Sequence, residues 1–322
     1  MDQDNAPDGT VGLQVQAVPG GVRLSWKAEG RETHLYRSTS PLGLTRLNDV
    51  RFPIVTFRPE GRKFEDTWLP DGAPIHYQLR VTDARGRRHY SEVVGLERPA
   101  RPLPKVAKPS LYVDKVHYYL EVRDGGRGVK RYPVALGRNP FRRKLHMDNA
   151  STPEGRFHIL GLQPKATFYR AYDLDYPTAV DRERYEFAGA AGLLPTPPPD
   201  IGGEIQIHGK GIHANWTWGC VALRNPDMDE LFAHPEIAAG TPVEIAGHEI
   251  TAADLASPLA KAEVTAVQEA LRSRGYDPGP SDGQLGAATR KALGKFQVAS
   301  GLPVTMFPDQ RTLERLRTPA RP

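Results

Sequence analysis

The chain has 322 residues, of which 39% are hydrophobic and 25% are charged. This length exceeds one typical domain, and no apolar run approaches the roughly 18 residues that a membrane-spanning helix needs, so a membrane span is excluded. The net charge of +5 favours an anionic partner, which a wall polymer and a nucleic acid satisfy equally well.

The N-terminus and the single cysteine bear on the compartment of the protein. Residues 1–5 contain neither the basic nor the apolar segment of a signal peptide, and we expect that an export signal preceded Asp2 and was removed. With one cysteine, Cys220, an internal disulfide bond is excluded. In an envelope protein such a thiol is a candidate reactive group.

Residues 1–100 contain short runs in which polar and apolar residues alternate, beginning at 11–15 and 22–26. Short strands at this spacing predict a β-sandwich. With Trp26 and Tyr77 at positions expected to be buried, the segment resembles fibronectin type III domains. A sandwich without a binding function is the simpler interpretation, because a fold does not determine a function.

A proline-rich segment at residues 101–109 predicts a semi-rigid linker and a domain boundary. Strand-like runs follow at 111–115, 118–122, 129–137 and 241–245. The last of these is expected to close the sheet. Residues 165–203 are less regular and are interpreted either as a cap over a cleft or as a surface connection.

The stretch 205–225 holds Cys220 and two histidines. Alternation at 204–207 predicts a half-buried strand that ends at His208 and Gly209, and a helix is expected to start at Asn225. A thiol next to a glycine with an imidazole nearby has the parts of a cysteine nucleophile, since a protonated histidine and backbone N–H groups lower the pKa of a thiol.

His208-Gly209, followed by Thr217 and Gly219-Cys220, resembles the signature of the YkuD family of L,D-transpeptidases, which remodel bacterial peptidoglycan. Residues 134–140 and 152–157 are similar to the first half of the family's domain. Trp218 stands where the family has a second histidine, and Ala222 where it has an arginine. These departures are similar to those of a divergent branch that includes hydrolytic enzymes, so transfer and hydrolysis both stay open.

The resemblance implies that Cys220 attacks a peptide carbonyl to form a thioester, with His208 as the general base and the N–H groups of Gly219 and Cys220 as an oxyanion hole. His213 is the alternative base. The candidate substrate-binding residues surround these groups: Gly209, Trp216, Thr217, Trp218, Arg224, Asn225 and Tyr176. Of Trp216 and Trp218, one is expected to pack in the core and the other to contact substrate.

No cofactor or metal is expected at this site. The alternatives to a nucleophilic role for Cys220 are an inert buried cysteine and a zinc site in which Cys220 is joined by His208, His213 or His234.

Residues 258–322 resemble the small three-helix peptidoglycan-binding domain. Apolar residues recur at helical spacing over 264–271 and 289–296, and a third helix is expected at 310–316. The matching positions are Val267-Gln268, Leu271, Gly275-Tyr276, 282–286, Thr289, Phe296-Gln297 and Gly301-Leu302.

The predicted architecture is therefore multi-domain: an N-terminal β-sandwich (1–100), a linker (101–109), a mostly-β L,D-transpeptidase domain with few helices (110–247) and a C-terminal three-helix bundle (258–322). The resemblance implies transfer on peptidoglycan stem peptides with release of D-alanine. Hydrolysis by the same fold and wall binding without catalysis are the alternatives. The expected partner is peptidoglycan rather than nucleic acid, and the expected location is the periplasm or cell envelope.

Overall fold

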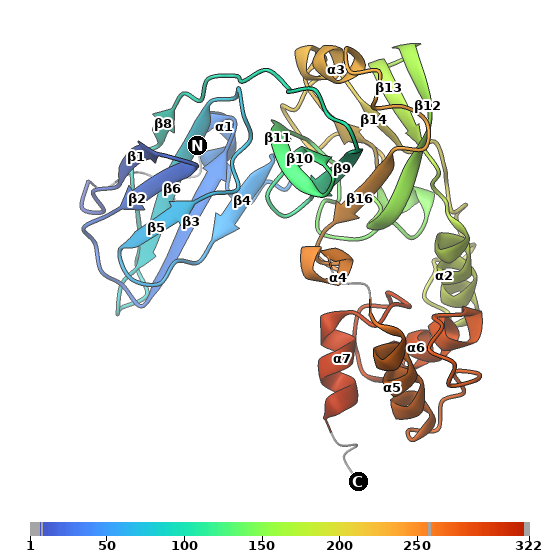
Figure 1. The fold of residues 1–322 in the computed structure, drawn as a ribbon. Helices are drawn as coiled ribbons and strands as arrows, with labels where there is room; N and C mark the ends of the chain where they lie inside the picture. Colours follow the sequence, from blue (N-terminus) through green and yellow to red (C-terminus); the bar gives the residue numbers. More distant parts are fainter. Residues whose placement is uncertain (1–6, 8, 257–258, 319–322) are drawn as a thin grey trace.

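Figure 1 shows the computed structural model of the chain, which describes residues 7, 9–256 and 259–318. Two β-rich parts are followed by a helical part. The expectation about a removed export signal concerns residues 1–5, which lie outside the described residues. Within the described residues, no helix has the length and apolar character needed to cross a membrane.

The N-terminal part contains two antiparallel sheets. The three-stranded sheet consists of β1 (Gln14–Val18), β2 (Gly21–Ser25) and β5 (Lys63–Asp66). The second consists of β4 (Ile54–Phe57), β3 (Glu32–Ser38), β6 (Ile75–Thr82), β7 (Arg88–Tyr90) and β8 (Val94–Leu96), with helix α1 (Pro41–Leu44) beside β3. Leu24, Leu35 and Tyr77 are fully buried in a shared core. The assignment to the fibronectin type III class stays a prediction.

The central part is one eight-stranded sheet. Its strands follow the order β11 (Arg127–Pro133), β10 (Tyr119–Asp124), β9 (Pro109–Asp114), β16 (Pro242–Ala246), β12 (Gly155–Ala166), β13 (Tyr169–Leu174), β14 (Gln206–His208) and β15 (Val221–Ala222). The expectation that residues 241–245 close the sheet is wrong. Strand β16 lies inside the sheet, because it pairs with β9 in parallel and with β12 in antiparallel orientation.

Helix α2 (Ala179–Ala190) corrects the expectation of an irregular segment at 165–203. Thr178 caps it: its hydroxyl accepts the Asp181 N–H, and the Asp181 carboxylate accepts the Thr178 N–H at 3.0 Å. This reciprocal pair satisfies two N–H groups that a helix start otherwise leaves without partners. The predicted helix at Asn225 is present as α3 (Asn225–Phe232).

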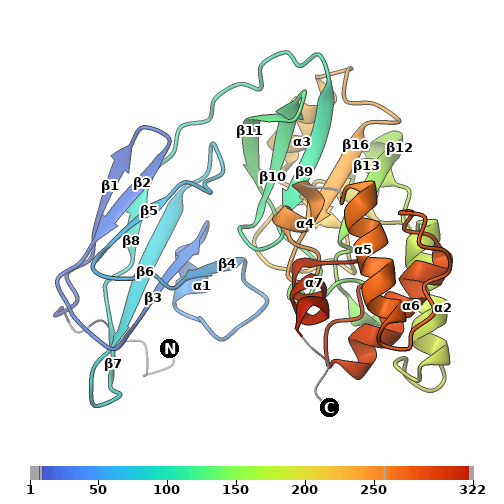
Figure 2. The same ribbon diagram turned by 60° about the horizontal axis from the view of Figure 1, so that its bottom comes forward.

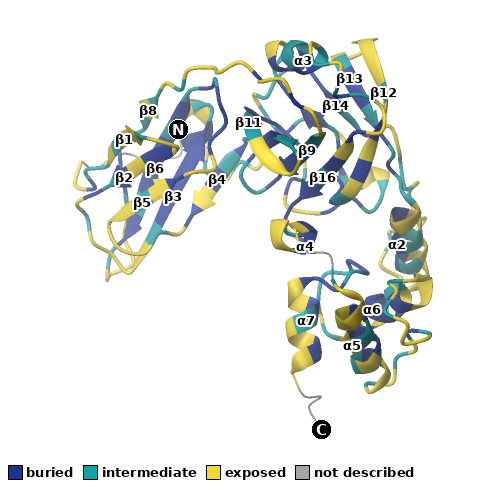
Figure 3. Ribbon diagram, in the orientation of Figure 1, coloured by how far each residue is buried: buried dark blue, intermediate teal, exposed yellow. Residues whose placement is uncertain are grey.

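The C-terminal part contains α5 (Lys261–Arg272), α6 (Ala287–Ala299) and α7 (Gln310–Arg317), which correspond to the three predicted helices. Leu271, Leu293 and Phe296 belong to their core, while the outer helix faces are exposed (Figure 3). Figures 1 and 2 both show α6 beside α2 of the central part. The short helix α4 (Ala252–Ala256) precedes this domain.

Both outer parts contact the central part through hydrogen bonds. Arg290 of α6 pairs with Glu183 of α2, with donor to oxygen distances of 2.6 and 2.7 Å. On the other side, the Arg37 guanidinium donates to the His117 carbonyl at 2.7 Å. The linker is extended but not free, because Leu103 is buried and its N–H donates to the Glu230 carboxylate at 2.7 Å.

Candidate active site

Strands β14 and β15 bring the two sequence motifs together. They run parallel, with Ile207 opposite Val221 and His208 opposite Ala222. Cys220 directly precedes this pair and therefore lies opposite Gln206. The parallel pairing therefore brings the histidine that ends β14 and the cysteine that precedes β15 onto adjacent strands.

The Cys220 thiol is half-buried, and its Sγ lies 3.7 Å from the Glu204 carbonyl. Two clefts of about 650 and about 680 Å³ meet at this residue. Burial raises the pKa of the Cys220 thiol, although the Gln206 N–H and Lys144 act in the opposite direction. The expected lowering of the thiol pKa is therefore wrong, since burial outweighs the groups that favour thiolate. A thiol in this state needs a base to become a nucleophile.

His208 is fully buried, and its Nδ1 lies 2.8 Å from the Gly209 carbonyl oxygen. A carbonyl only accepts hydrogen bonds, so Nδ1 carries the hydrogen and Nε2 keeps its lone pair. Nε2 is buried, and no hydrogen-bond partner for it exists among the described residues. Burial lowers the pKa of His208, which keeps the ring neutral. Phe168 and Trp216 fix the ring plane, with centroid distances of 4.9 and 5.3 Å.

Gly209 and Asn225 shape the turn that follows His208. The Asn225 Oδ1 accepts the Lys210 N–H at 2.7 Å. A Cβ on Gly209 would lie 2.7 Å from that same oxygen and 3.0 Å from Tyr169, so the close approach requires glycine. Asn225 thus positions the turn and does not line either cleft at Cys220.

Thr217 fixes the turn that carries the cysteine. Its hydroxyl donates to the Cys220 carbonyl at 2.7 Å and accepts the Gly219 N–H at 3.2 Å. Gly219 has a φ of +138°, and a Cβ there would lie 2.7 Å from the Ser151 carbonyl. The Gly219 N–H, which the sequence assigns to an oxyanion hole, is thus already bonded to Thr217.

The two tryptophans differ in exposure. Trp216 packs against His208 and donates its indole N–H to the Gly211 carbonyl at 3.1 Å. Trp218 is 54% exposed, lines the smaller cleft and lies under the Arg138 guanidinium, 4.9 Å from its ring centroid. Trp216 therefore has the packing position, whereas Trp218 lies open to solvent at the smaller cleft, and substrate contact by Trp218 stays a prediction.

The remaining candidates differ in whether they line a cleft at Cys220. His213 is exposed and lines neither cleft at Cys220. Arg224 is bound to the Asp227 carboxylate at 2.7 Å and to the Gly72 carbonyl at 2.6 Å, so it joins the N-terminal and central parts. Tyr176 is buried but lines the larger cleft.

Two residues near the site have no sequence signal in the motifs. Lys144 lines the smaller cleft with Cys220, and its ammonium donates to the Trp218 carbonyl at 3.0 Å. Asn215 is buried in the loop between His208 and Cys220, where its amide donates to the Val50 carbonyl of the N-terminal part at 3.0 Å. Both contacts arise only when distant segments fold together.

A metal site was one alternative for Cys220. In the part of the chain that the structure describes, no group of three or more His, Cys, Asp or Glu side chains has an arrangement that holds a metal ion. His234 lies 3.1 Å from the Glu236 carboxylate.

Family comparison identifies two of the parts. Residues 108–245 match YkuD, the L,D-transpeptidase catalytic domain family, and residues 260–316 match the PG_binding_1 family of peptidoglycan binding domains. The central part is thus a YkuD catalytic domain, and the C-terminal part is a peptidoglycan-binding domain. No curated protein matches the chain.

Solved structures similar to this chain include L,D-transpeptidases. The L,D-transpeptidase of Xylanimonas cellulosilytica is 18% identical over 45% of this chain and 64% of its own, with a TM-score of 0.28. L,D-transpeptidase 1 of Mycobacterium tuberculosis is 14% identical over 61% of this chain and 79% of its own, with a TM-score of 0.27. SltB3 of Pseudomonas aeruginosa is 43% identical over 19% of this chain and 16% of its own, with a TM-score of 0.19. This chain thus covers less than two thirds of the Xylanimonas and Pseudomonas structures.

Proposed function

We propose that this protein is a peptidoglycan L,D-transpeptidase that works through a thioester on Cys220. The observation that carries the proposal is the pairing of β14 with β15, which brings a buried His208, whose Nε2 keeps a free lone pair, onto the strand next to the half-buried Cys220 thiol. This pairing lies in a YkuD catalytic domain that a peptidoglycan-binding domain follows.

The proposed reaction begins when His208 Nε2 takes the proton of the Cys220 thiol. The thiolate attacks the carbonyl carbon of the bond between diaminopimelate and D-alanine in a stem peptide. The imidazolium returns its proton to the D-alanine nitrogen, the C–N bond breaks, and a thioester remains. An amine of a second stem then attacks the thioester, loses a proton to His208 and releases the thiol.

The oxyanion that develops on the carbonyl needs a hydrogen-bond donor. Since Thr217 already accepts the Gly219 N–H, we assign this role to the N–H of Cys220. Thr217 supports the assignment, because its bond to the Cys220 carbonyl fixes the orientation of that residue's backbone.

Transfer is favoured over hydrolysis by the two clefts that meet at Cys220. One cleft gives room for the donor stem and the other for the acceptor amine. Exclusion of water by both tryptophans does not support transfer, because Trp218 is 54% exposed. The proposal therefore rests on room for two substrates and not on a dry site.

The test offers the purified protein a disaccharide tetrapeptide with and without an amine acceptor such as a D-amino acid, and mass spectrometry follows the products. We expect D-alanine release together with an exchange product or a cross-linked dimer, and no reaction with Cys220→Ala. Release of tripeptide alone, unchanged by the acceptor, would mean a hydrolase. A reactive Cys220→Ala would contradict the thioester, and inactive protein with an unreactive thiol would favour a wall-binding role.

We further propose that the protein acts outside the cytoplasm, in the periplasm or cell envelope, where its polymer lies. The basic net charge of +5 and the peptidoglycan-binding domain support binding to the wall. Co-sedimentation of the protein with purified sacculi measures this binding directly.

A further inference from the structure

Lys144 lies at the turn that carries the nucleophile, although nothing in the family motifs points to it. The side chain is 2% exposed, and its ammonium donates to the Trp218 carbonyl at 3.0 Å. A Cβ built on Gly219 would lie 3.3 Å from Lys144 Nζ, so the ammonium lies against the residue that precedes Cys220. Lys144 and Cys220 also line the same cleft of about 650 Å³.

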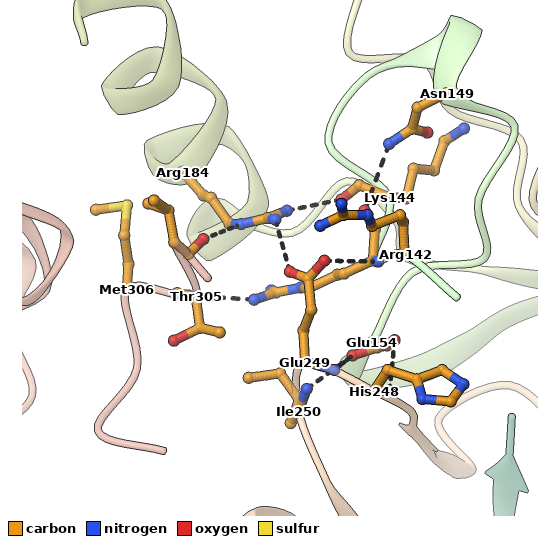
Figure 4. A network of polar contacts seen from close by, with 12 residues as sticks. Arg142, Lys144, Asn149, Glu154, Arg184, His248, Glu249, Ile250, Thr305 and Met306 are labelled. Carbon is orange, nitrogen blue, oxygen red and sulfur yellow. Dashed lines mark hydrogen bonds and ion pairs between the residues drawn. The ribbon is translucent and has the colours of Figure 1, made fainter. Parts of the chain in front are cut away.

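The backbone of Lys144 is held from outside the catalytic sheet. Arg184 of α2 donates to the Lys144 carbonyl at 2.8 Å and to the Val304 carbonyl of the peptidoglycan-binding domain at 2.7 Å. The neighbouring Arg143 donates to the Thr305 carbonyl at 3.2 Å. Figure 4 shows Arg184 between Glu249, the Lys144 backbone and the segment of Thr305. The lysine is therefore fixed by a cluster that joins two domains.

We propose that the Lys144 ammonium is a positioning residue of the active site, which stabilises the thiolate of Cys220 as His208 removes its proton. The inference rests on the proposed role of Cys220 as the nucleophile. Lys144 keeps its own three protons throughout: the thiol proton goes to His208 Nε2, and the lysine supplies only a positive charge and a hydrogen bond. A charge in a partly buried site interacts more strongly than one in water.

Among the charged side chains that act on the Cys220 thiol, Lys144 is the one that favours the thiolate, and backbone N–H groups act in the same direction. Burial and Glu204 raise the pKa of the Cys220 thiol, whereas the Gln206 N–H, Lys144 and the Cys220 backbone lower it. Burial lowers the pKa of Lys144, and Cys220 and Asp148 raise it. Asp200 also lines the cleft. His208, the proposed base, is buried with its pKa lowered, and it is neutral before the proton moves.

The test measures the alkylation of Cys220 by iodoacetamide against pH in the full-length protein. Cys220 is the only cysteine, so the alkylation has a single site. We expect Lys144→Met and Lys144→Gln to react about tenfold more slowly at pH 7 and to shift the profile to higher pH, because each removes the charge that favours the thiolate. Glutamine keeps a hydrogen-bond donor, so its result separates charge from hydrogen bonding.

Two controls complete the test. Lys144→Arg keeps the charge and should restore the wild-type profile, and Lys63→Met removes a charge from an exposed lysine of the N-terminal part and should leave it unchanged. Profiles of Lys144→Met and Lys144→Gln that overlay the wild type would overturn the proposal. Activity retained by Cys220→Ala would instead overturn the proposed function, so the two failures are distinguishable.

If the Lys144 variants do not fold, a measurement on Lys144 in the wild-type protein tests the proposal instead. In protein with ¹³C-labelled lysine, one ε-carbon signal should show an inflection at the pH where the thiol titrates, and Cys220→Ala should remove it. The coupling of the two charges is reciprocal, so a lysine that favours the thiolate must sense it. The absence of any such signal would contradict the proposal.

Discussion

At the residue scale, His208 and His213 differ in burial, and this difference decides between the two candidate bases. His208 is fully buried with a free Nε2, whereas His213 is exposed. We predict that His208→Gln lowers turnover by about 10²- to 10⁴-fold, the usual range for loss of a general base. His213→Gln is the matched control and should stay within about twofold of the wild type if it takes no part in proton transfer. Steady-state rates on a soluble tetrapeptide donor compare the two, and a larger loss with His213→Gln would reverse the assignment.

The pH dependence of kcat/KM follows from the directions of the two pKa shifts. Burial lowers the pKa of His208 from its usual 6.5 and raises that of the Cys220 thiol. The neutral imidazole and neutral thiol that the mechanism needs therefore coexist over a wide range. We predict that kcat/KM rises with pH through a midpoint below 6.5 and then forms a plateau across neutral pH. Rates on a soluble donor between pH 4 and 9 test this, and an acid limb centred above 6.5 would show that His208 is not the titrating base.

The sequence predicted residues of this site where a reactive side chain stands directly beside a glycine that the backbone requires. Cys220 and His208 each stand beside a glycine, and for both glycines the structure shows an approach too close for a Cβ. Lys144 and Asn215 were missed because they have no local pattern. Lys144 reaches Trp218 across 74 positions, and Asn215 reaches Val50 across 165 positions.

At the element scale, a buried ion pair ties strand β9 to the start of β12. Lys115, which follows β9, lies 2.8 Å from the Glu154 carboxylate, and both side chains are fully buried. The Lys115 ammonium also donates to the Thr152 carbonyl at 2.8 Å, and Glu154 accepts the N–H of Ile250 at 2.7 Å. These bonds anchor the end of β9, the beginning of β12 and the segment after β16 at one point.

We predict that Lys115→Met lowers the free energy of unfolding by about 3–5 kcal/mol, because it leaves the Glu154 carboxylate buried without its partner. The matched control is Arg23→Met, which removes a half-exposed pair with Glu65 and should cost at most about 1 kcal/mol. Urea denaturation of the two variants gives both values. Equal losses of unfolding free energy in the two variants would show that burial does not set the strength of the ion pair between Lys115 and Glu154.

The sequence predicts the strands themselves more readily than their order in the sheet. The interior position of β16 follows from its parallel pairing with β9, more than 100 residues earlier, and alternation within a strand says nothing about its neighbours. Helix α2 was missed because only Asp181, Arg184 and Ala188 are buried in it, so it lacks an apolar stripe. The pair of Thr178 and Asp181 three positions apart was its one local signal.

At the scale of the whole molecule, both outer parts contact segments that carry the site. The N-terminal part reaches the loop between His208 and Cys220, where the Asn215 N–H donates to the Arg51 carbonyl at 2.5 Å. The C-terminal part reaches Lys144 through Arg184. Composition and motifs predicted these parts as separate modules that bind a polymer. They did not predict the contacts between the modules, because such contacts depend on complementary surfaces that no local pattern encodes.

These contacts between domains change the effect that we expect from deletion of the peptidoglycan-binding domain. If the domain only anchored the enzyme, deletion of residues 258–322 would weaken co-sedimentation with sacculi and leave the turnover of soluble fragments intact. Instead, deletion removes the Val304 and Thr305 carbonyls that accept from Arg184 and Arg143, two guanidinium groups that are at most 7% exposed. Leaving donors on charged groups without partners costs about 1–3 kcal/mol or more. We therefore predict a lower melting temperature and a several-fold slower turnover of soluble tetrapeptide as well as weaker wall binding.

The control for this deletion is Arg290→Ala in the full-length chain. It removes the pair with Glu183 between the same two domains, but that pair is partly exposed, so its loss should cost at most about 1 kcal/mol and leave the turnover of soluble fragments unchanged. Calorimetry and soluble-substrate kinetics on both proteins separate anchoring from support of the site. A deleted protein that melts and turns over soluble fragments like the full chain would show that the contacts at Val304 and Thr305 do not hold Lys144 in place, and that the C-terminal domain serves the polymer alone.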